Sequence, residues 1–181
     1  QQSWYAFDHF YSDSAYPQVL PVIFAGKPKK LMDIGTNVGK FTILAGKFDP
    51  DVHITMVDLP DQLQNAIRNV EQAGLSDRVT PLALDLLNEE NKLPGGHDIY
   101  WMSQFLSCFG KKEITSILRR IVEVMDDKAT VYILETCWDR QQHEASTYSL
   151  INTSLYFTCM ASGNSKMYDS KELLELSLIH I

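Results

Sequence analysis

A chain of 181 residues, 45% hydrophobic and 22% charged, is long enough for one domain with a substantial core. Its net charge of −7 argues against a nucleic-acid-binding surface, which needs clustered cations, and the basic pair Arg119-Arg120 is explained by a solvated face. Its 3 cysteines form no zinc-ligand pattern, and no apolar stretch approaches the roughly 20 residues of a membrane-spanning helix, so we expect a cytoplasmic protein without metal or membrane contact.

Short apolar runs alternate along the chain with segments of helical periodicity. Reading from the N-terminus, we expect strands at 30–35, 52–58, 79–85, 98–104 and 129–136. The segments with helical spacing are 40–48, 61–74, 111–125 and 141–161. Continuous runs of Val, Ile, Leu and Tyr are typical of parallel strands that helices cover on both faces. The alternation therefore predicts an α/β fold with a doubly wound, mostly parallel sheet flanked by helices.

The late helix over 141–161 mixes hydroxyl and amide side chains into its apolar positions. Two interpretations are open, a core helix with tolerated hydroxyls and a helix that lines a pocket. In the second interpretation an aromatic acceptor would meet Tyr148, Tyr156, Phe157 and Met160.

The first predicted strand ends in a glycine-containing turn. Asp33 is followed by Gly35-Thr36-Asn37-Val38-Gly39, and then by a helix. Glycine lets the backbone adopt positive φ and lets a ligand approach closely, and Asn is the residue next best suited to that conformation. Ligands of doubly wound sheets bind beyond the carboxyl ends of the strands. We therefore expect a nucleotide-type ligand at this turn, with Asn37 in place of a second glycine.

Two ligand classes compete for the turn. A dinucleotide fingerprint G-x-G-x-x-G that starts at Gly35 would need glycine at positions 37 and 40, where the chain has Asn37 and Lys40. S-adenosylmethionine brings no pyrophosphate, and its ammonium group needs acceptors such as Asp33. The spacing therefore favours S-adenosylmethionine over a nicotinamide dinucleotide.

Two further acids end the next two strands. Asp58 follows the turn by about 20 residues, where a carboxylate can accept both ribose hydroxyls. Asp85 ends the third strand, where it could face the adenine amino group beside apolar Leu86. Each acid alone is more simply a surface residue or a helix cap, but three at successive strand ends indicate a nucleoside site.

The chain resembles the class I S-adenosylmethionine-dependent methyltransferases, in particular the small-molecule O-methyltransferases that include the caffeate and acetylserotonin enzymes. Four blocks within residues 30–176 carry the resemblance: "MDIGTNVG", "VDLP", "LALDLL" and "DIYWMSQFLSCFGKKEITSILRRI". The family's fold is Rossmann-like. The resemblance implies cofactor-binding roles for Asp33, Gly35, Asn37, Gly39, Asp58, Leu59, Asp85, Leu86 and Ser103.

The family's catalytic residues match less well. Its general base is the His of an L-H-D-W pattern, and Ser107 stands at that place. Of the two glutamates that orient this His in the family, one matches Glu135 and the other falls on Met167. A serine hydroxyl cannot act as a base near neutral pH, so the base is an open question. His9 and His143 are candidates, and an already anionic acceptor would need no base.

The ends of the chain lead to expectations about domain organisation. We expect an N-terminal helical segment over 1–29, a methyltransferase domain over 30–176 and a truncated or non-native tail over 177–181 that contains His180. Compared with the family, the C-terminal strand pair is expected to be missing, and a longer form is expected to be a homodimer.

The sequence predicts an enzyme that transfers a methyl group from S-adenosylmethionine to a small molecule, with an oxygen favoured by the resemblance and an aromatic acceptor among the candidates. A homologue that binds the cofactor without catalysis, with a regulatory or assembly role, is the alternative. A nicotinamide-dependent oxidoreductase is a third alternative, which the glycine spacing favours less.

Overall fold

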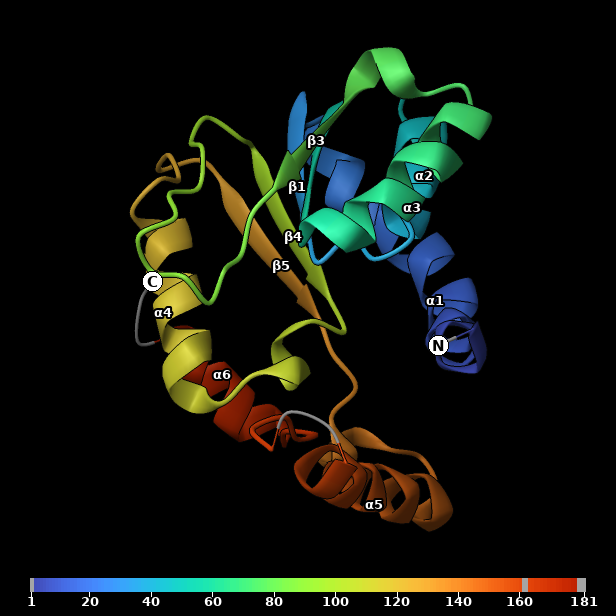
Figure 1. Cartoon of the computed structure of the whole chain (residues 1–181), viewed down its shortest axis with the longest axis vertical. Coiled ribbons are helices and arrows are strands. Elements are labelled where there is room, and N and C mark those ends of the chain that lie inside the picture. Colours follow the sequence, from blue (N-terminus) through green and yellow to red (C-terminus); the bar gives the residue numbers. More distant parts are fainter. Residues whose placement is uncertain (1, 161–162, 179–181) are drawn as a thin grey trace. The chain divides into compact units, whose positions relative to one another are not determined.

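The computed structural model describes residues 2–160 and 163–178, and the side chains of 12–159 and 163–177. The side chains of His9 and Met160, together with His180 and most of the predicted tail, lie outside this description. Figure 1 shows the elements in chain order: α1 (Gln2–Ile23), β1 (Lys30–Ile34), α2 (Lys40–Phe48), β2 (His53–Asp58), α3 (Pro60–Gln72), β3 (Val79–Ala83), β4 (Ile99–Ser103), α4 (Lys111–Val122), β5 (Thr130–Leu134), α5 (Glu144–Met160) and α6 (Ser170–Leu178). Short 3-10 turns occupy Phe24–Gly26, Ser76–Arg78, Leu106–Cys108 and Trp138–Arg140.

The five strands form one sheet in the order β3-β2-β1-β4-β5. β1 pairs in parallel with β2, and β2 pairs in parallel with β3. The starts of β1, β4 and β5 are also linked, because the Asp98 N–H donates to the Lys30 carbonyl at 2.9 Å and the Thr130 N–H donates to the Asp98 carbonyl at 2.9 Å. Since β1 lies between β2 and β4, sequence order reverses at β1. The predicted doubly wound α/β fold is confirmed.

The chain divides into two compact units. The first unit comprises 1–84, 97–100 and 128–132, and the second comprises 85–96, 101–127 and 133–181. The first unit holds the glycine turn and the ends of β1 and β2. The second holds the segments that follow β3, β4 and β5.

The core of the first unit forms around β1, where Leu31, Met32 and Ile34 are fully buried. α3 buries Leu63, Ala66 and Val70, which recur at the three- and four-residue spacing of one helix face. The helix ends at Gln72, and Gly74, two residues later, has a φ of +71°. The Gly74 N–H donates to the Glu71 carbonyl at 3.0 Å, and the Leu75 N–H donates to the Val70 carbonyl at 3.2 Å, which is a Schellman cap.

In the second unit, α4 buries an apolar stripe of Ile114, Ile117, Leu118 and Ile121. It begins at Lys111, after the Gly110 N–H donates to Glu113 Oε2 at 2.8 Å. The helix ends at Val122 rather than at Met125, because the N–H groups of Val124 and Met125 both turn back to the Ile121 carbonyl.

The predicted late helix is α5, and it begins at Glu144 because the His143 carbonyl accepts the Ser146 N–H at 3.0 Å. Leu150 is buried. Phe157 is half-buried, and four other large apolar side chains of the helix are at least 45% exposed: Tyr148, Ile151, Leu155 and Tyr156. A pocket lined by this helix therefore stays a prediction.

Candidate functional site

The turn after β1 has the conformation that its glycines predict. Gly35 and Gly39 have φ of +75° and +78°, and Asn37 between them has φ of +52°. The Gly35 N–H donates to the Val57 carbonyl of β2 at 2.8 Å, and the Gly39 N–H closes the turn on the Thr36 carbonyl at 2.8 Å. Asn37 thus adopts the left-handed conformation in which asparagine can take the place of glycine.

Gly39 also lies close to α3. A Cβ atom added at Gly39 would approach the backbone and Cβ atoms of Ala66 to 3.4 Å, and the positive φ would strain any larger residue. We expect Gly39→Ala to lower the free energy of unfolding by about 1 to 2 kcal/mol. Urea denaturation measures this, with Gly26→Ala as control, because a Cβ at Gly26 meets nothing within 4 Å. Equal midpoints for the two variants would contradict the expectation.

Asp33 is buried beneath the turn, with 2% of its side chain exposed. Its Oδ2 accepts hydrogen bonds from the Thr42 hydroxyl at 2.6 Å and the Thr36 hydroxyl at 2.9 Å. Burial raises the pKa of Asp33 to about 6; the two threonine hydroxyls lower it, and the nearby Asp58 raises it. The carboxylate therefore connects the turn to α2 through these two hydrogen bonds.

Asp58, the last residue of β2, lies on the other side of the turn. Its Oδ2 accepts the Asn37 N–H at 2.8 Å, and its Oδ1 accepts the Leu59 N–H at 2.8 Å. Burial raises the pKa of Asp58, and these two N–H groups oppose the rise. Each carboxylate oxygen can accept a second hydrogen bond, and the Leu59 side chain is 48% exposed beside it. The first unit thus brings together a glycine turn, a carboxylate with spare acceptor capacity and an exposed apolar side chain.

The second unit holds the other three residues with predicted cofactor roles. Asp85 is exposed, and its Oδ1 accepts the Leu87 N–H at 2.9 Å. Leu86 is buried, whereas its neighbour Leu87 is 52% exposed. Ser103 is half-buried at the end of β4. The exposed apolar side chain in this segment is therefore that of Leu87 and not that of Leu86, and the sequence predicted no role for Leu87.

Arg120 holds the loop that follows Asp85. Although a solvated face was expected for the Arg119-Arg120 pair, Arg120 is only 8% exposed, so that expectation was wrong for this residue. Its guanidinium donates to the carbonyl oxygens of Leu86, Asn88 and Asn91, and its Nε donates to the Ser116 carbonyl at 3.3 Å. A buried charge needs this many partners, so Arg120 fixes the loop over 86–91 to α4.

Glu135, just after β5, accepts hydrogen bonds from the backbone of the turn that contains Ser107. Its Oε1 accepts the N–H groups of Phe105 and Leu106 at 2.7 Å each, and that of Ser107 at 3.4 Å. Its Oε2 is buried and has no hydrogen-bond partner among the residues that the structure describes. Burial raises the pKa of Glu135 to about 7, although these N–H groups and the Ser107 hydroxyl lower it.

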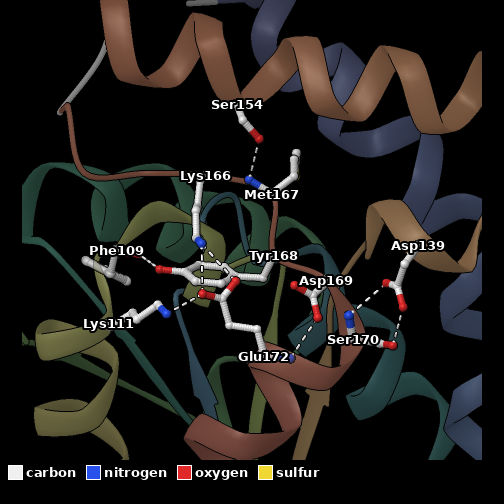
Figure 2. Close-up of polar contacts among 10 residues, drawn as sticks. All are labelled: Phe109, Lys111, Asp139, Ser154, Lys166, Met167, Tyr168, Asp169, Ser170 and Glu172. Carbon is white, nitrogen blue, oxygen red and sulfur yellow. Dashed lines mark hydrogen bonds and ion pairs between the residues drawn. The ribbon is translucent and has the colours of Figure 1, made fainter.

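The carbonyl oxygens of the same turn accept hydrogen bonds from residues 165–168, which we call the strap. The Ser107 carbonyl accepts the Lys166 N–H at 3.1 Å, and the Cys108 carbonyl accepts the Ser165 hydroxyl at 3.0 Å. The next carbonyl, of Phe109, accepts the Tyr168 hydroxyl at 2.8 Å (Figure 2). The strap thus bonds three successive carbonyl oxygens.

The middle residues of the strap are themselves anchored to α5 and α6. Lys166 Nζ pairs with both carboxylate oxygens of Glu172 on α6, at 2.9 and 2.8 Å, and lies 4.6 Å from the centre of the Tyr168 ring. Lys111 at the start of α4 shares the same Glu172, and the Met167 N–H donates to Ser154 of α5 at 2.9 Å (Figure 2). Ser107 therefore lies on a turn whose backbone is fixed from both sides.

Of the residues with predicted catalytic roles whose side chains are described, the structure brings Ser107 and Glu135 together. His143 is exposed at the start of α5, and no contact of the described part of the chain joins it to either of the other two. Among the described side chains, no three His, Cys, Asp or Glu residues lie where they could share a metal ion. None of the helices in the described ranges has the length and apolar character needed to cross a membrane.

Several residues that shape these clusters were missed by the sequence analysis. Thr36 and Thr42 bind Asp33, but a threonine near an acid is too common to predict a contact. Arg120 carried no local signal, because its partners are carbonyl oxygens about 30 positions earlier in the chain. The strap carried none, since its partners lie almost 60 positions earlier in the chain.

Comparison with known proteins shows the family to which the chain belongs. The model of a family described as O-methyltransferase domain matches residues 18–176. An L-tyrosine C(3)-methyltransferase of Streptomyces lavendulae is 21% identical over 93% of this chain and 45% of its own length. A 3-hydroxy-5-methyl-1-naphthoate 3-O-methyltransferase of Streptomyces sahachiroi is 28% identical over 61% of this chain and 32% of its own length. The chain thus spans less than half the length of these curated relatives.

Solved structures share the fold. PigF with S-adenosylhomocysteine superposes with a TM-score of 0.82 at 17% identity, covering 95% of this chain and 50% of that one. NcsB1, an O-methyltransferase from neocarzinostatin biosynthesis in complex with S-adenosylmethionine and 2-hydroxy-5-methyl naphthoic acid, gives a TM-score of 0.70 at 21% identity, covering 83% of this chain and 42% of that one. The predicted fold and the predicted resemblance are both confirmed. Since the family match runs from residue 18 to residue 176 of 181, this chain belongs to the O-methyltransferase domain family.

Proposed function

We propose that this chain is the cofactor-binding part of an S-adenosylmethionine-dependent methyltransferase that acts on a small molecule, with oxygen as the favoured methyl acceptor. The observation that supports this most is the turn after β1. Its positive-φ residues leave the backbone open to a close approach, and Asp58 keeps unused acceptor capacity beside it. The family match supports the reaction type.

In this proposal each residue of the first unit has a distinct task. Asp58 accepts the two ribose hydroxyls, Leu59 packs against the nucleoside, and Gly35, Asn37 and Gly39 let the amino-acid tail approach the backbone. Asp33 contributes mainly by holding the turn, because both threonine hydroxyls already bind its Oδ2. The cofactor supplies a sulfonium-bound methyl group, and a nucleophilic acceptor displaces it. Roles for Asp85, Leu86 and Ser103 stay predictions.

The class of acceptor is proposed from relatives. One curated relative is named for methylating a naphthoate oxygen and another for methylating a carbon of tyrosine, and both acceptors are phenols. A phenolic acceptor is therefore our proposal. A cytoplasmic location, a homodimer and the domain boundary at residue 30 also remain proposals.

Calorimetric titration with S-adenosylhomocysteine, S-adenosylmethionine and NAD tests the cofactor assignment. We expect the two sulfur compounds to bind and NAD not to bind. Asp58→Ala is expected to weaken S-adenosylhomocysteine binding about 100-fold, because two hydrogen bonds to a charged group are lost at about 1.5 kcal/mol or more each.

Asp61→Ala is the matched control, since Asp61 is an exposed acid in the first turn of α3, three residues from Asp58. It should bind like the unchanged chain. Tight NAD binding without the sulfur compounds would overturn the proposal. Methyl transfer from labelled cofactor to a panel of phenols separates catalysis from binding alone, and binding without transfer to any acceptor would favour the catalytically degenerate alternative.

A further inference from the structure

The glycine turn after β1 has a backbone that its own residues do not fully determine. Gly35, Asn37 and Gly39 all have positive φ, and residues in such conformations keep them only where the surrounding structure holds them. Glycine adopts positive and negative φ about equally readily, so Gly39 by itself does not select its value of +78°. The shape of the turn therefore depends on contacts from outside it.

Two of these contacts come from acids with predicted cofactor roles. Asp58 accepts the Asn37 N–H at 2.8 Å. Asp33 accepts the Thr36 hydroxyl at 2.9 Å. Both contacts act on the first half of the turn, whereas the second half, from Val38 onward, is held by α3.

The contact with α3 uses two residues on one face of that helix. Ala66 lies so close to Gly39 that an added Cβ there would approach it to 3.4 Å. Asn69 follows three residues later and so lies on the same face. It is half-buried, and its Nδ2 donates to the Val38 carbonyl at 2.9 Å. A carbonyl oxygen only accepts hydrogen bonds, so the NH2 of the Asn69 amide must be the group that faces it.

This hydrogen bond fixes the peptide group that joins Val38 to Gly39. A trans peptide is planar, and its carbonyl and N–H point in opposite directions. With the carbonyl directed at Asn69, the Gly39 N–H points to the Thr36 carbonyl, which accepts it at 2.8 Å. Rotating the peptide by half a turn would break both hydrogen bonds and bring the Val38 oxygen toward that of Thr36. Asn69 thus disfavours a second orientation that the φ freedom of Gly39 allows.

We propose that Asn69 is a positioning residue for cofactor binding, which holds the peptide between Val38 and Gly39 in the orientation that the amino-acid tail of S-adenosylmethionine meets. This inference rests on the proposed function, which places that tail at the turn. Asn69 acts through the backbone of the turn. A ligand that binds one of two orientations binds more weakly in proportion to the population of the other.

Substitution of Asn69 tests the effect on binding. Asn69→Ala removes the donor and retains a good helix former, and Asn69→Asp keeps the shape but places a carboxylate against the Val38 carbonyl. We expect calorimetry to show S-adenosylhomocysteine binding weakened about five- to tenfold by Asn69→Ala and at least as much by Asn69→Asp.

Asn65→Ala is the matched control. Asn65 lies on α3 one helical turn before Asn69, is also half-buried, and accepts a hydrogen bond from Arg68 of the same helix. Its loss should leave the affinity for S-adenosylhomocysteine unchanged.

Amide hydrogen exchange followed by NMR gives a second readout, which needs no cofactor. In Asn69→Ala the Gly39 N–H should exchange faster than in the unchanged chain. The Gly35 N–H should keep its rate, because it donates to the Val57 carbonyl in the first half of the turn. Saturating S-adenosylhomocysteine should restore the protection of Gly39, because the ligand selects the orientation to which it binds.

The possible results separate the two proposals. If the unchanged chain binds S-adenosylhomocysteine and Asn69→Ala binds it equally well, the positioning role is wrong and the cofactor assignment stands. Faster exchange along the whole of α3, rather than at Gly39, would also overturn the positioning role, because Asn69 would then act on the packing of the helix. If the unchanged chain binds neither sulfur compound, the proposed function fails and the positioning role fails with it.

Discussion

The chain is expected to unfold more easily at pH 8 than at pH 5.5, the reverse of what ion-paired surface acids would produce. Burial raises the pKa of Asp33 from 3.8 to about 6 and that of Glu135 from 4.5 to about 7. Between the ordinary and the raised values the folded chain holds protons that the unfolded chain has released, so the free energy of unfolding falls as pH rises. At about 1.4 kcal/mol for each pH unit over which one proton is held, we expect the free energy of unfolding to fall by about 2 to 3 kcal/mol between pH 5.5 and pH 8.

Urea unfolding at fixed pH values between 5 and 8 measures this loss. The double variant Asp33→Asn, Glu135→Gln should remove most of the slope, because neither side chain then titrates. Asp51 is a suitable control acid: it is fully exposed, and its hydrogen bond with Lys29 lowers its pKa, so Asp51→Asn should leave the slope above pH 5 unchanged. A stability that rises steadily from pH 5 to pH 8 would contradict the expectation.

Arg120→Met is expected to lower the free energy of unfolding by about 3 kcal/mol or more. The methionine keeps much of the apolar stem but removes donors from carbonyl oxygens of the loop over 86–91 and from that of Ser116. Each buried acceptor left without a partner costs about 1 to 3 kcal/mol, and movement of the loop toward water recovers part of that cost. We therefore also expect faster amide hydrogen exchange in residues 86–91.

Its neighbour on α4 provides the control. Arg119 is 57% exposed and has only a 3.8 Å ion pair with Glu123 one helical turn away, so Arg119→Met should change the unfolding free energy by about 0.5 kcal/mol or less. Similar unfolding midpoints for the two variants, with no change in exchange over 86–91, would show that Arg120 does not hold the loop.

The sequence predicted the sheet and most helices because their signals are local. Continuous apolar runs give the strands, and the three- and four-residue spacing of Ile114, Ile117 and Ile121 gives α4. The left-handed conformation of Asn37 was predictable for the same reason, since it depends on the residue and its immediate neighbours. The family resemblance then placed Ser107 and Glu135, which the structure shows in contact.

The parts that the sequence could not predict depend on distant partners. Arg120 was expected on a solvated face because its burial depends on carbonyl oxygens about 30 residues earlier. The second threonine that binds Asp33 lies in the next helix, and the strap reaches back almost 60 residues. Neither contact has a repeating spacing that would reveal it in a single chain.

The turn over 105–109 has one more consequence, for the evolution of this site. Glu135 binds its N–H groups and the strap binds its carbonyl oxygens, so these contacts address main-chain atoms of the turn, which residues of any type supply. The turn can therefore keep its shape while the side chain at position 107 changes. Selection could exchange the residue at position 107 without refolding the turn, so the chemistry of this side chain can change through a single substitution.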